Sequence, residues 1–163
     1  SGIGTFGFNL EKNTIYVNDM FYRTERGFSD EKTAFAVCHE IEHFLEKKMM
    51  IEEDGGSGKF SRYLDKISKS RAYGLLDNCV ADIRENRSVI EKTGRDFMDT
   101  EEIIYREDLF PKADFLQDPL HIQFAQAILR ERRLSDEKCA VANEVREKLE
   151  ALDGIVNKNK LYT

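Results

Sequence analysis

The segment Cys38–Leu45, with the sequence Cys-His-Glu-Ile-Glu-His-Phe-Leu, constrains this chain more than any other stretch. His39 and His43 are four residues apart, so on an α-helix both imidazoles leave the same face, one turn from each other. Two imidazoles placed in this way can bind one metal ion. Glu40, beside the first histidine, can act on a water molecule at the same metal. The segment therefore predicts a helix that carries part of a metal centre.

Chance rarely produces this spacing in a chain with so few histidines. The sequence holds only 3 histidines among 163 residues, and random placement of its residues yields His-Glu-x-x-His about 0.6% of the time. On a helix the pattern is the signature of a zinc hydrolase, with the glutamate as general base. We therefore predict that His39 and His43 bind Zn²⁺ and that Glu40 is the catalytic residue.

The predicted site needs a third protein ligand, because catalytic zinc takes three and leaves the fourth position for water. Asp82 is the preferred candidate, since it lies beside apolar positions of a predicted helix, where an unpaired carboxylate is costly. A plain salt bridge from Asp82 to Arg84 or Arg71 is the alternative without a metal. Glu85 and His121 are the other candidate ligands, although His121 is also read as a half-buried structural histidine.

The remaining sequence predicts an α+β fold that is mostly helical, with a small N-terminal β-hairpin or sheet. Alternation from Thr5 to Leu10 and β-branched and aromatic residues from Thr14 to Asn18 predict the hairpin. Apolar residues at helical spacing predict the helices, and Leu45 and Leu76 are among those expected to face the core. The predicted helices cover about 31–48 with a cap at Ser29 or Asp30, 70–92 with Gly94 as the stop, a short piece within 101–110, a helix starting at Asp118-Pro119, and a last helix from Ser135 to Gly154.

The glycine-rich segment Asp54–Lys59 predicts a connector or a mobile lid near the cleft. Its Gly-Lys pair is not a phosphate loop, because Phe60 rather than Ser or Thr follows it.

Composition and charge exclude several classes of protein. A length of 163 residues suits a single domain covering 1–163. The net charge of −6 and the pI of about 5.2 argue against a nucleic-acid binder. No apolar run approaches a membrane span, and no signal peptide is visible. Three cysteines without Cys-x-x-Cys spacing fit reduced thiols in the cytoplasm. The start at Ser1-Gly2 indicates a fragment of a larger protein with further domains.

The motif His39-Glu40-x-x-His43 resembles the zincin metallopeptidases. In that superfamily the two histidines bind zinc, the glutamate is the general base, and a downstream residue is the third ligand. Zincins usually carry an uncharged residue at the position of Glu42, so we expect Glu42 to pair with an arginine from another segment.

The segment Asn78–Asn86 carries a second, narrower likeness. It is similar to the N-x-x-x-D-x-x-x-N helix of predicted bacterial and phage-type metallopeptidase domains, some of which precede von Willebrand A-like domains. Together the two motifs span the chain from the first long helix through the second. This resemblance implies a minimal zincin-like metallopeptidase fold, Asp82 as the third ligand, and Asn78 and Asn86 as supporting residues.

These observations predict a cytoplasmic zinc metallopeptidase that acts on a peptide or protein substrate, without nucleic-acid or membrane partners. An exposed hairpin edge would hold an extended peptide across the metal. Tyr73, Tyr105 and Arg84 are candidates for stabilising the oxyanion. Two alternatives remain open: an inactive zincin-like interaction module within a larger protein, and zinc-dependent hydrolysis of a small amide.

Overall fold

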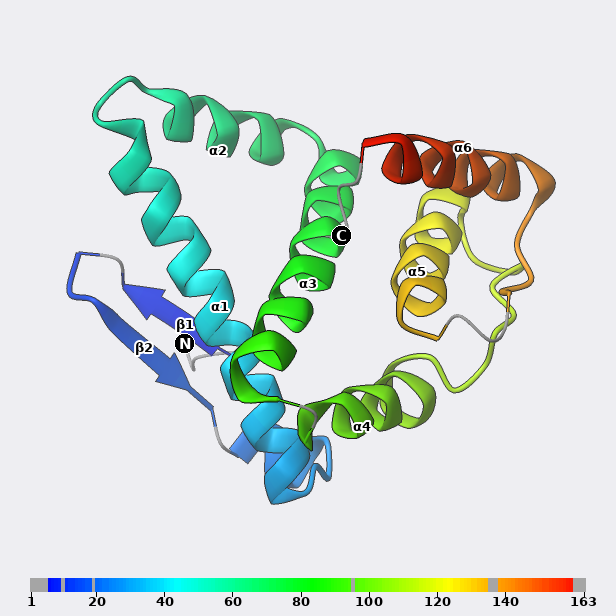
Figure 1. Ribbon diagram of the computed structural model, residues 1–163, viewed down its shortest axis with the longest axis horizontal. Coiled ribbons are helices and arrows are strands. Elements are labelled where there is room, and N and C mark those ends of the chain that lie inside the picture. Colours follow the sequence, from blue (N-terminus) through cyan, green and yellow to red (C-terminus); the bar gives the residue numbers. More distant parts are fainter. Residues whose placement is uncertain (1–5, 10, 19, 95, 135–137, 160–163) are drawn as a thin grey trace. The chain divides into compact units, whose positions relative to one another are not determined.

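Helices make up most of the chain, beside a small two-stranded antiparallel sheet (Figure 1). The computed structural model describes residues 6–9, 11–18, 20–94, 96–134 and 138–159, with the backbone alone for 96 and 153–159. The mostly helical α+β class is therefore confirmed. The chain divides into two compact units, Ser1–Ile104 and Tyr105–Thr163, and each is described by itself. A single domain over 1–163 stays a prediction.

The N-terminal hairpin consists of β1 (Phe6–Asn9) and β2 (Thr14–Val17), paired in antiparallel register. Asn13 takes the left-handed conformation in the turn, with φ of 51°, which asparagine tolerates better than most residues. One face of the hairpin is apolar, and its Phe8 ring lies 5.7 Å from the Phe44 ring on the first helix. The predicted hairpin is confirmed; the predicted strand ends Thr5 and Leu10 lie outside the described residues.

The first helix, α1 (Asp30–Asp54), carries the histidine motif and lies between the hairpin and α3 in Figure 1. The Ser29 hydroxyl accepts a hydrogen bond from the Lys32 amide at 3.2 Å, which confirms the predicted cap. The helix continues past the predicted end at Lys48, because no helix-breaking residue occurs before Gly55. Gly55 ends it in the left-handed conformation, with φ of 52°.

A short helix that the sequence did not reveal, α2 (Lys59–Lys69), follows the glycine turn. Asp54 caps it, accepting a hydrogen bond from the backbone amide of its first residue at 2.8 Å. Tyr63 anchors it to the two long helices: its hydroxyl accepts from Lys47 of α1 and donates to Asp77 of α3, both at 2.6 Å. The segment predicted as a connector or lid is therefore a tight turn into an anchored helix.

The second long helix, α3 (Arg71–Thr93), has the predicted boundaries. The Ser70 hydroxyl caps its start by accepting from the Tyr73 amide at 3.2 Å, and Gly94 ends it with φ of 86°. Its buried face differs from the predicted apolar stripe, because Leu76 is 39% exposed. Leu45 on α1, also expected in the core, is 39% exposed. The buried positions of α3 mix polar with apolar residues: Cys79, Ala81, Glu85, Asn86 and Val89.

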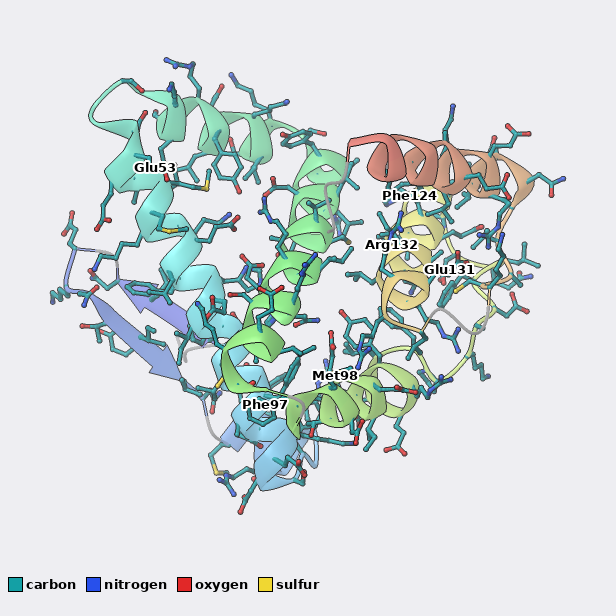
Figure 2. The ribbon with its side chains drawn as sticks, viewed as in Figure 1. Glu53, Phe97, Met98, Phe124, Glu131 and Arg132 are labelled. Carbon is teal, nitrogen blue, oxygen red and sulfur yellow. The ribbon has the colours of Figure 1, made fainter. Side chains whose placement is uncertain are left out.

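The core of the first unit forms where α1, α3 and α4 (Asp96–Ile103) meet. Phe35 of α1 packs with Val89 of α3 and with Ile104. The ring of Phe97 on α4, labelled in Figure 2, meets the Phe35 ring edge-on at 5.8 Å. The ambiguous segment 101–110 thus contains the end of α4 and a π-helical turn, Ile104–Leu109.

The second unit contains α5 (Leu120–Arg133) and α6 (Asn143–Asn159). The predicted start of the last helix near Ser135 is wrong, although 135–137 themselves lie outside the described residues. The chain at 138–142 is extended, because Ala140 pairs with the segment around Asp114 in a parallel bridge. The predicted stop at Gly154 is also wrong, since the backbone stays helical to the end of α6.

Among the described helices, none combines the length and apolar character needed to cross a membrane. No disulfide joins the three cysteines, all of which lie within the described residues.

Candidate metal centre

Three side chains from two helices converge at one point: His39 and His43 of α1 and Asp82 of α3. The Nε2 atom of His43 lies 3.0 Å from Nε2 of His39 and 3.0 Å from Oδ1 of Asp82. The Nε2 atom of His39 lies 3.6 Å from the same oxygen. Ligand atoms around a tetrahedral zinc ion, each about 2.0–2.2 Å from the metal, are about 3.3 Å apart. The three donor atoms therefore have the spacing of three corners of such a site.

Within the described residues, the basic partners of Asp82 are histidines. In the part of the chain that the structure describes, its ion pairs are with His39 and His43. The predicted alternative, a salt bridge from Asp82 to Arg84 or Arg71, does not occur among the ion pairs of the described residues, and Arg84 pairs with Glu46 of α1. Burial alone would raise the pKa of Asp82, but hydrogen bonds to the two histidines lower it. Asp82 thus has a carboxylate oxygen that could bind a cation.

The other ring nitrogen of each histidine faces an acceptor on α3. Nδ1 of His39 lies 2.6 Å from Oδ1 of Asn86, and Nδ1 of His43 lies 3.1 Å from Oε2 of Glu85. An acceptor at Nδ1 of His39 favours a proton there and leaves its Nε2 lone pair available. At His43 burial would lower the pKa, but the Asp82 and Glu85 carboxylates raise it to about 10, so a metal ion at Nε2 would have to displace a proton. Histidine ligands of metals are oriented in this way by their outer neighbours. Both Nε2 atoms thus lie at the point where Oδ1 of Asp82 also lies.

Two asparagines flank Asp82 at intervals of one helical turn, and each contacts a member of the cluster. The Asn78 amide donates to Oδ2 of Asp82 at 3.1 Å, which leaves Oδ1 for the point of convergence. Asn86 faces His39 from the other side. Both asparagines thus lie where supporting residues of a metal centre would lie.

Glu40 is half-buried beside the cluster. Burial raises the pKa of its carboxyl group; the nearby His39 and His43 oppose this effect, and Asp82 adds to it. A carboxylate with a raised pKa is better suited to accept a proton near neutral pH. Tyr22 lies near Glu40 and was not a candidate in the sequence. Burial and the charge of Glu40 raise its pKa to about 12. Tyr22 precedes α1, and no helical or alternating apolar pattern in the sequence marks it as part of the site.

Glu42, the charged residue inside the motif, is paired on the far part of α3. Its carboxylate accepts from the Ser88 hydroxyl at 2.8 Å and from the Lys92 ammonium at 2.6 and 2.7 Å. The expected arginine partner is therefore wrong, and a lysine takes that role. Both carboxylate oxygens of Glu42 therefore accept hydrogen bonds from Ser88 or Lys92, away from the donor atoms of the cluster.

The alternative third ligands lie in other positions. Glu85 faces Nδ1 of His43, whereas the Nε2 atoms meet Asp82. His121 belongs to α5 in the second unit, where its side chain is exposed. The prediction of a half-buried structural histidine is therefore wrong for His121. Of the ligand candidates on α3, Asp82 has the closer approach to both Nε2 atoms.

The predicted oxyanion-stabilising residues have other partners. The Lys66 ammonium lies 4.2 Å from the centroid of the Tyr73 ring. Arg84 is paired with Glu46. Tyr105 is buried in the second unit.

Comparison of the chain with protein-family models, with curated proteins and with solved structures found no match. The interpretation of the centre therefore depends on its own geometry and chemistry.

Proposed function

We propose that this chain is a zinc-dependent metallopeptidase of the zincin type. His39, His43 and Asp82 hold the zinc ion in this proposal, and Glu40 is the general base. The observation that carries it is the convergence of two Nε2 atoms and one carboxylate oxygen at separations of 3.0 to 3.6 Å. Two histidines and a carboxylate form a known ligand set of catalytic zinc in peptidases.

The charge of the cluster supports a bound cation. Asp82 and Glu85 are largely buried, and their ion pairs within the described residues are with histidines. Burying carboxylates is costly unless a positive group compensates them. A zinc ion in the cluster would supply this charge while the histidines stay neutral ligands.

The reaction would use few groups of the chain. When bound, the zinc ion lowers the pKa of a water molecule toward about 7 and polarises the substrate carbonyl. Glu40 would accept one proton from the attacking water molecule as the water oxygen bonds to the carbonyl carbon. Glu40 would then deliver this proton to the leaving nitrogen as the C–N bond breaks, and the water oxygen would stay in the new carboxyl group together with the second hydrogen of the water. The raised pKa of Glu40 suits it to both steps.

An extended peptide is the proposed substrate, held along the hairpin. The hairpin lies against α1, where Phe8 meets Phe44 and the Lys48 ammonium donates to Oδ1 of Asn13 at 2.9 Å. In a two-stranded sheet each strand keeps one edge outside the hairpin pairing, and such an edge can bind an extended peptide. A cytoplasmic location is part of this proposal and fits the three free cysteines. The proposal also includes further domains of the same protein.

Peptide cleavage by the zinc-loaded chain tests the proposal. The matched variants are Glu40→Gln and Glu42→Gln, which remove neighbouring carboxylates of the same motif. We expect the wild type and Glu42→Gln to cleave a peptide library, and a zinc chelator to stop them. Glu40→Gln should keep its zinc and lose about 10²- to 10⁴-fold in rate.

Two results would contradict the peptidase proposal. A zinc-loaded chain that cleaves nothing, while Glu40→Gln still binds a partner protein, would favour an inactive interaction module. Cleavage restricted to small amides would move the substrate to another class.

A further inference from the structure

We infer that Glu85 is a positioning residue for His43, and that it thereby sets the affinity of the centre for zinc. This inference rests on the proposed function, because it treats His43 as a zinc ligand. It gives Glu85 a role distinct from that of a third ligand.

The His43 ring has a carboxylate close to each of its two nitrogens. Oε2 of Glu85 lies 3.1 Å from Nδ1 of His43, while Nε2 of the same ring lies 3.0 Å from Asp82. Within the described residues neither oxygen of the Glu85 carboxylate makes an aligned hydrogen bond, so Glu85 acts on His43 as a negative charge at ion-pair distance. Such a charge favours a proton on Nδ1 and increases the basicity of the nitrogen that binds the metal. Glu85 is only 3% exposed, so water competes little for this contact.

The spacing of the two acids on α3 supports the same role for Glu85. Asp82 and Glu85 are three residues apart, so they lie on one face of the helix in successive turns. One helix face thus offers a carboxylate to each nitrogen of the same imidazole. Asp82, whose carboxylate approaches both Nε2 atoms, is then the ligand, and Glu85 is the supporting residue.

An ion pair between α1 and α3 lies next to Glu85. Glu46 lies three residues after His43 on α1. Arg84, the neighbour of Glu85 on α3, pairs with Glu46. Glu46 and Glu85 both line a groove of 490 Å³ between the two helices. The Glu46–Arg84 ion pair joins α1 to α3 beside Glu85.

Zinc affinity, measured by competition with a chromophoric chelator, tests the inference. Glu85→Gln keeps a carbonyl oxygen that can accept from Nδ1, whereas Glu85→Met has a similar volume and no such acceptor. Glu91→Gln is the control, because Glu91 is an exposed carboxylate on the same helix, paired with Arg87. We expect Glu85→Met to bind zinc about 10- to 100-fold more weakly. Glu85→Gln should recover most of that loss, and Glu91→Gln should match the wild type.

A cobalt-substituted sample adds a spectroscopic readout that a general loss of stability would not move. The visible spectrum of the cobalt-loaded protein should change in Glu85→Met and be retained in Glu85→Gln. If Glu85→Met does not fold, as judged by circular dichroism, Glu85→Ala replaces it in the same comparison.

Two outcomes would overturn the inference. Wild-type affinity in both Glu85 variants would mean that this carboxylate does not support the site. An equally severe loss in both would mean that the charge of Glu85 binds the metal directly. A wild type that binds zinc and cleaves no peptide removes the peptidase proposal alone. A wild type that takes up no zinc removes both, and that result is read before any Glu85 variant.

Discussion

The two units solve the same electrostatic problem in different ways. In the second unit, Glu131 of α5 (Figure 2) accepts two hydrogen bonds from the Arg146 guanidinium, at 2.8 and 2.9 Å. It accepts a third from the Cys139 amide at 2.8 Å. In the first unit, Asp82 and Glu85 face histidines instead. Glu131 thus pairs with a permanent cation of its own chain, whereas Asp82 and Glu85 face the two nitrogens of the His43 imidazole.

The pKa values of the two regions reflect this difference. Burial would raise the pKa of Glu131, but hydrogen bonds from Arg146 and the Cys139 amide lower it below its usual value. Burial raises the pKa of Glu85, and the neighbouring carboxyl group of Glu46 contributes to that rise. The second cluster thus has a fixed cation, the Arg146 guanidinium, whereas the positive charge of the first comes from histidine. Burial would lower the pKa of His43, but the Asp82 and Glu85 carboxylates raise it to about 10.

The largest expected effect is the loss of a ligand from the first cluster. His43→Ala should weaken zinc binding by more than about 100-fold, beyond the range expected for an outer neighbour of a metal ligand. His121→Ala, in the second unit, is the matched control and should leave affinity unchanged. Isothermal titration with zinc measures both. Equal affinities in the two variants would contradict the assignment of His43.

Removal of the built-in cation should have the next largest effect, on stability rather than on zinc. Arg146→Met leaves Glu131 partly buried without its charged donor, which should lower the free energy of unfolding by about 1–3 kcal/mol. Urea denaturation measures this change. Zinc affinity should stay at the wild-type value, since no residue of the first cluster is altered. Loss of zinc binding in this variant would break the contrast between the two regions.

Acid should affect the second cluster in a defined direction. Because the pKa of Glu131 is lowered in the folded state, its stabilising contribution is present above the unfolded value of about 4.3. That contribution is lost as the pH falls through the lower folded value. Unfolding measured at pH 6 and at successive acid values should show a smaller loss in Glu131→Gln than in the wild type. The same loss in both would argue against this pair as an acid-sensitive element.

The smallest expected effect concerns Glu42. Its ion pair with Lys92 joins one mostly buried carboxylate to an ammonium that is 56% exposed. Breaking such a pair with Lys92→Met should cost at most about 1 kcal/mol and leave zinc affinity unchanged. Thermal unfolding and zinc titration check the two parts. A marked loss of zinc would show that Glu42, once released, interferes with the cluster.

Local signals explain what the sequence could predict. Ser29, Ser70 and Gly94 act within one turn of their own helix ends, so the boundaries that they mark were correctly placed. The four-residue spacing of His39 and His43 likewise fixes their shared face through helix geometry alone. Asp82 was selected as an acid with a poor local explanation, and the structure brings it to both histidines.

Features that depend on distant partners could not be predicted in this way. The cap-like sequence at Ser135 resembles a helix start, yet Ala140 pairs with the backbone near Asp114 and keeps 138–142 extended. The anchor of α2 needs Tyr63 to meet side chains from two other helices. The contact between Glu85 and Nδ1 of His43 depends on how α1 and α3 pack, which no spacing within one helix reveals.

Zinc content after dialysis tests the central claim most directly, that His39, His43 and Asp82 hold one metal ion. Wild type, Asp82→Ala and the exposed control Asp65→Ala are dialysed against zinc and then against zinc-free buffer, and the metal retained per chain is measured. The account predicts one zinc ion in the wild type and in Asp65→Ala, and loss of the ion in Asp82→Ala. A wild type without zinc, or an Asp82→Ala variant that retains as much as the wild type, would contradict it.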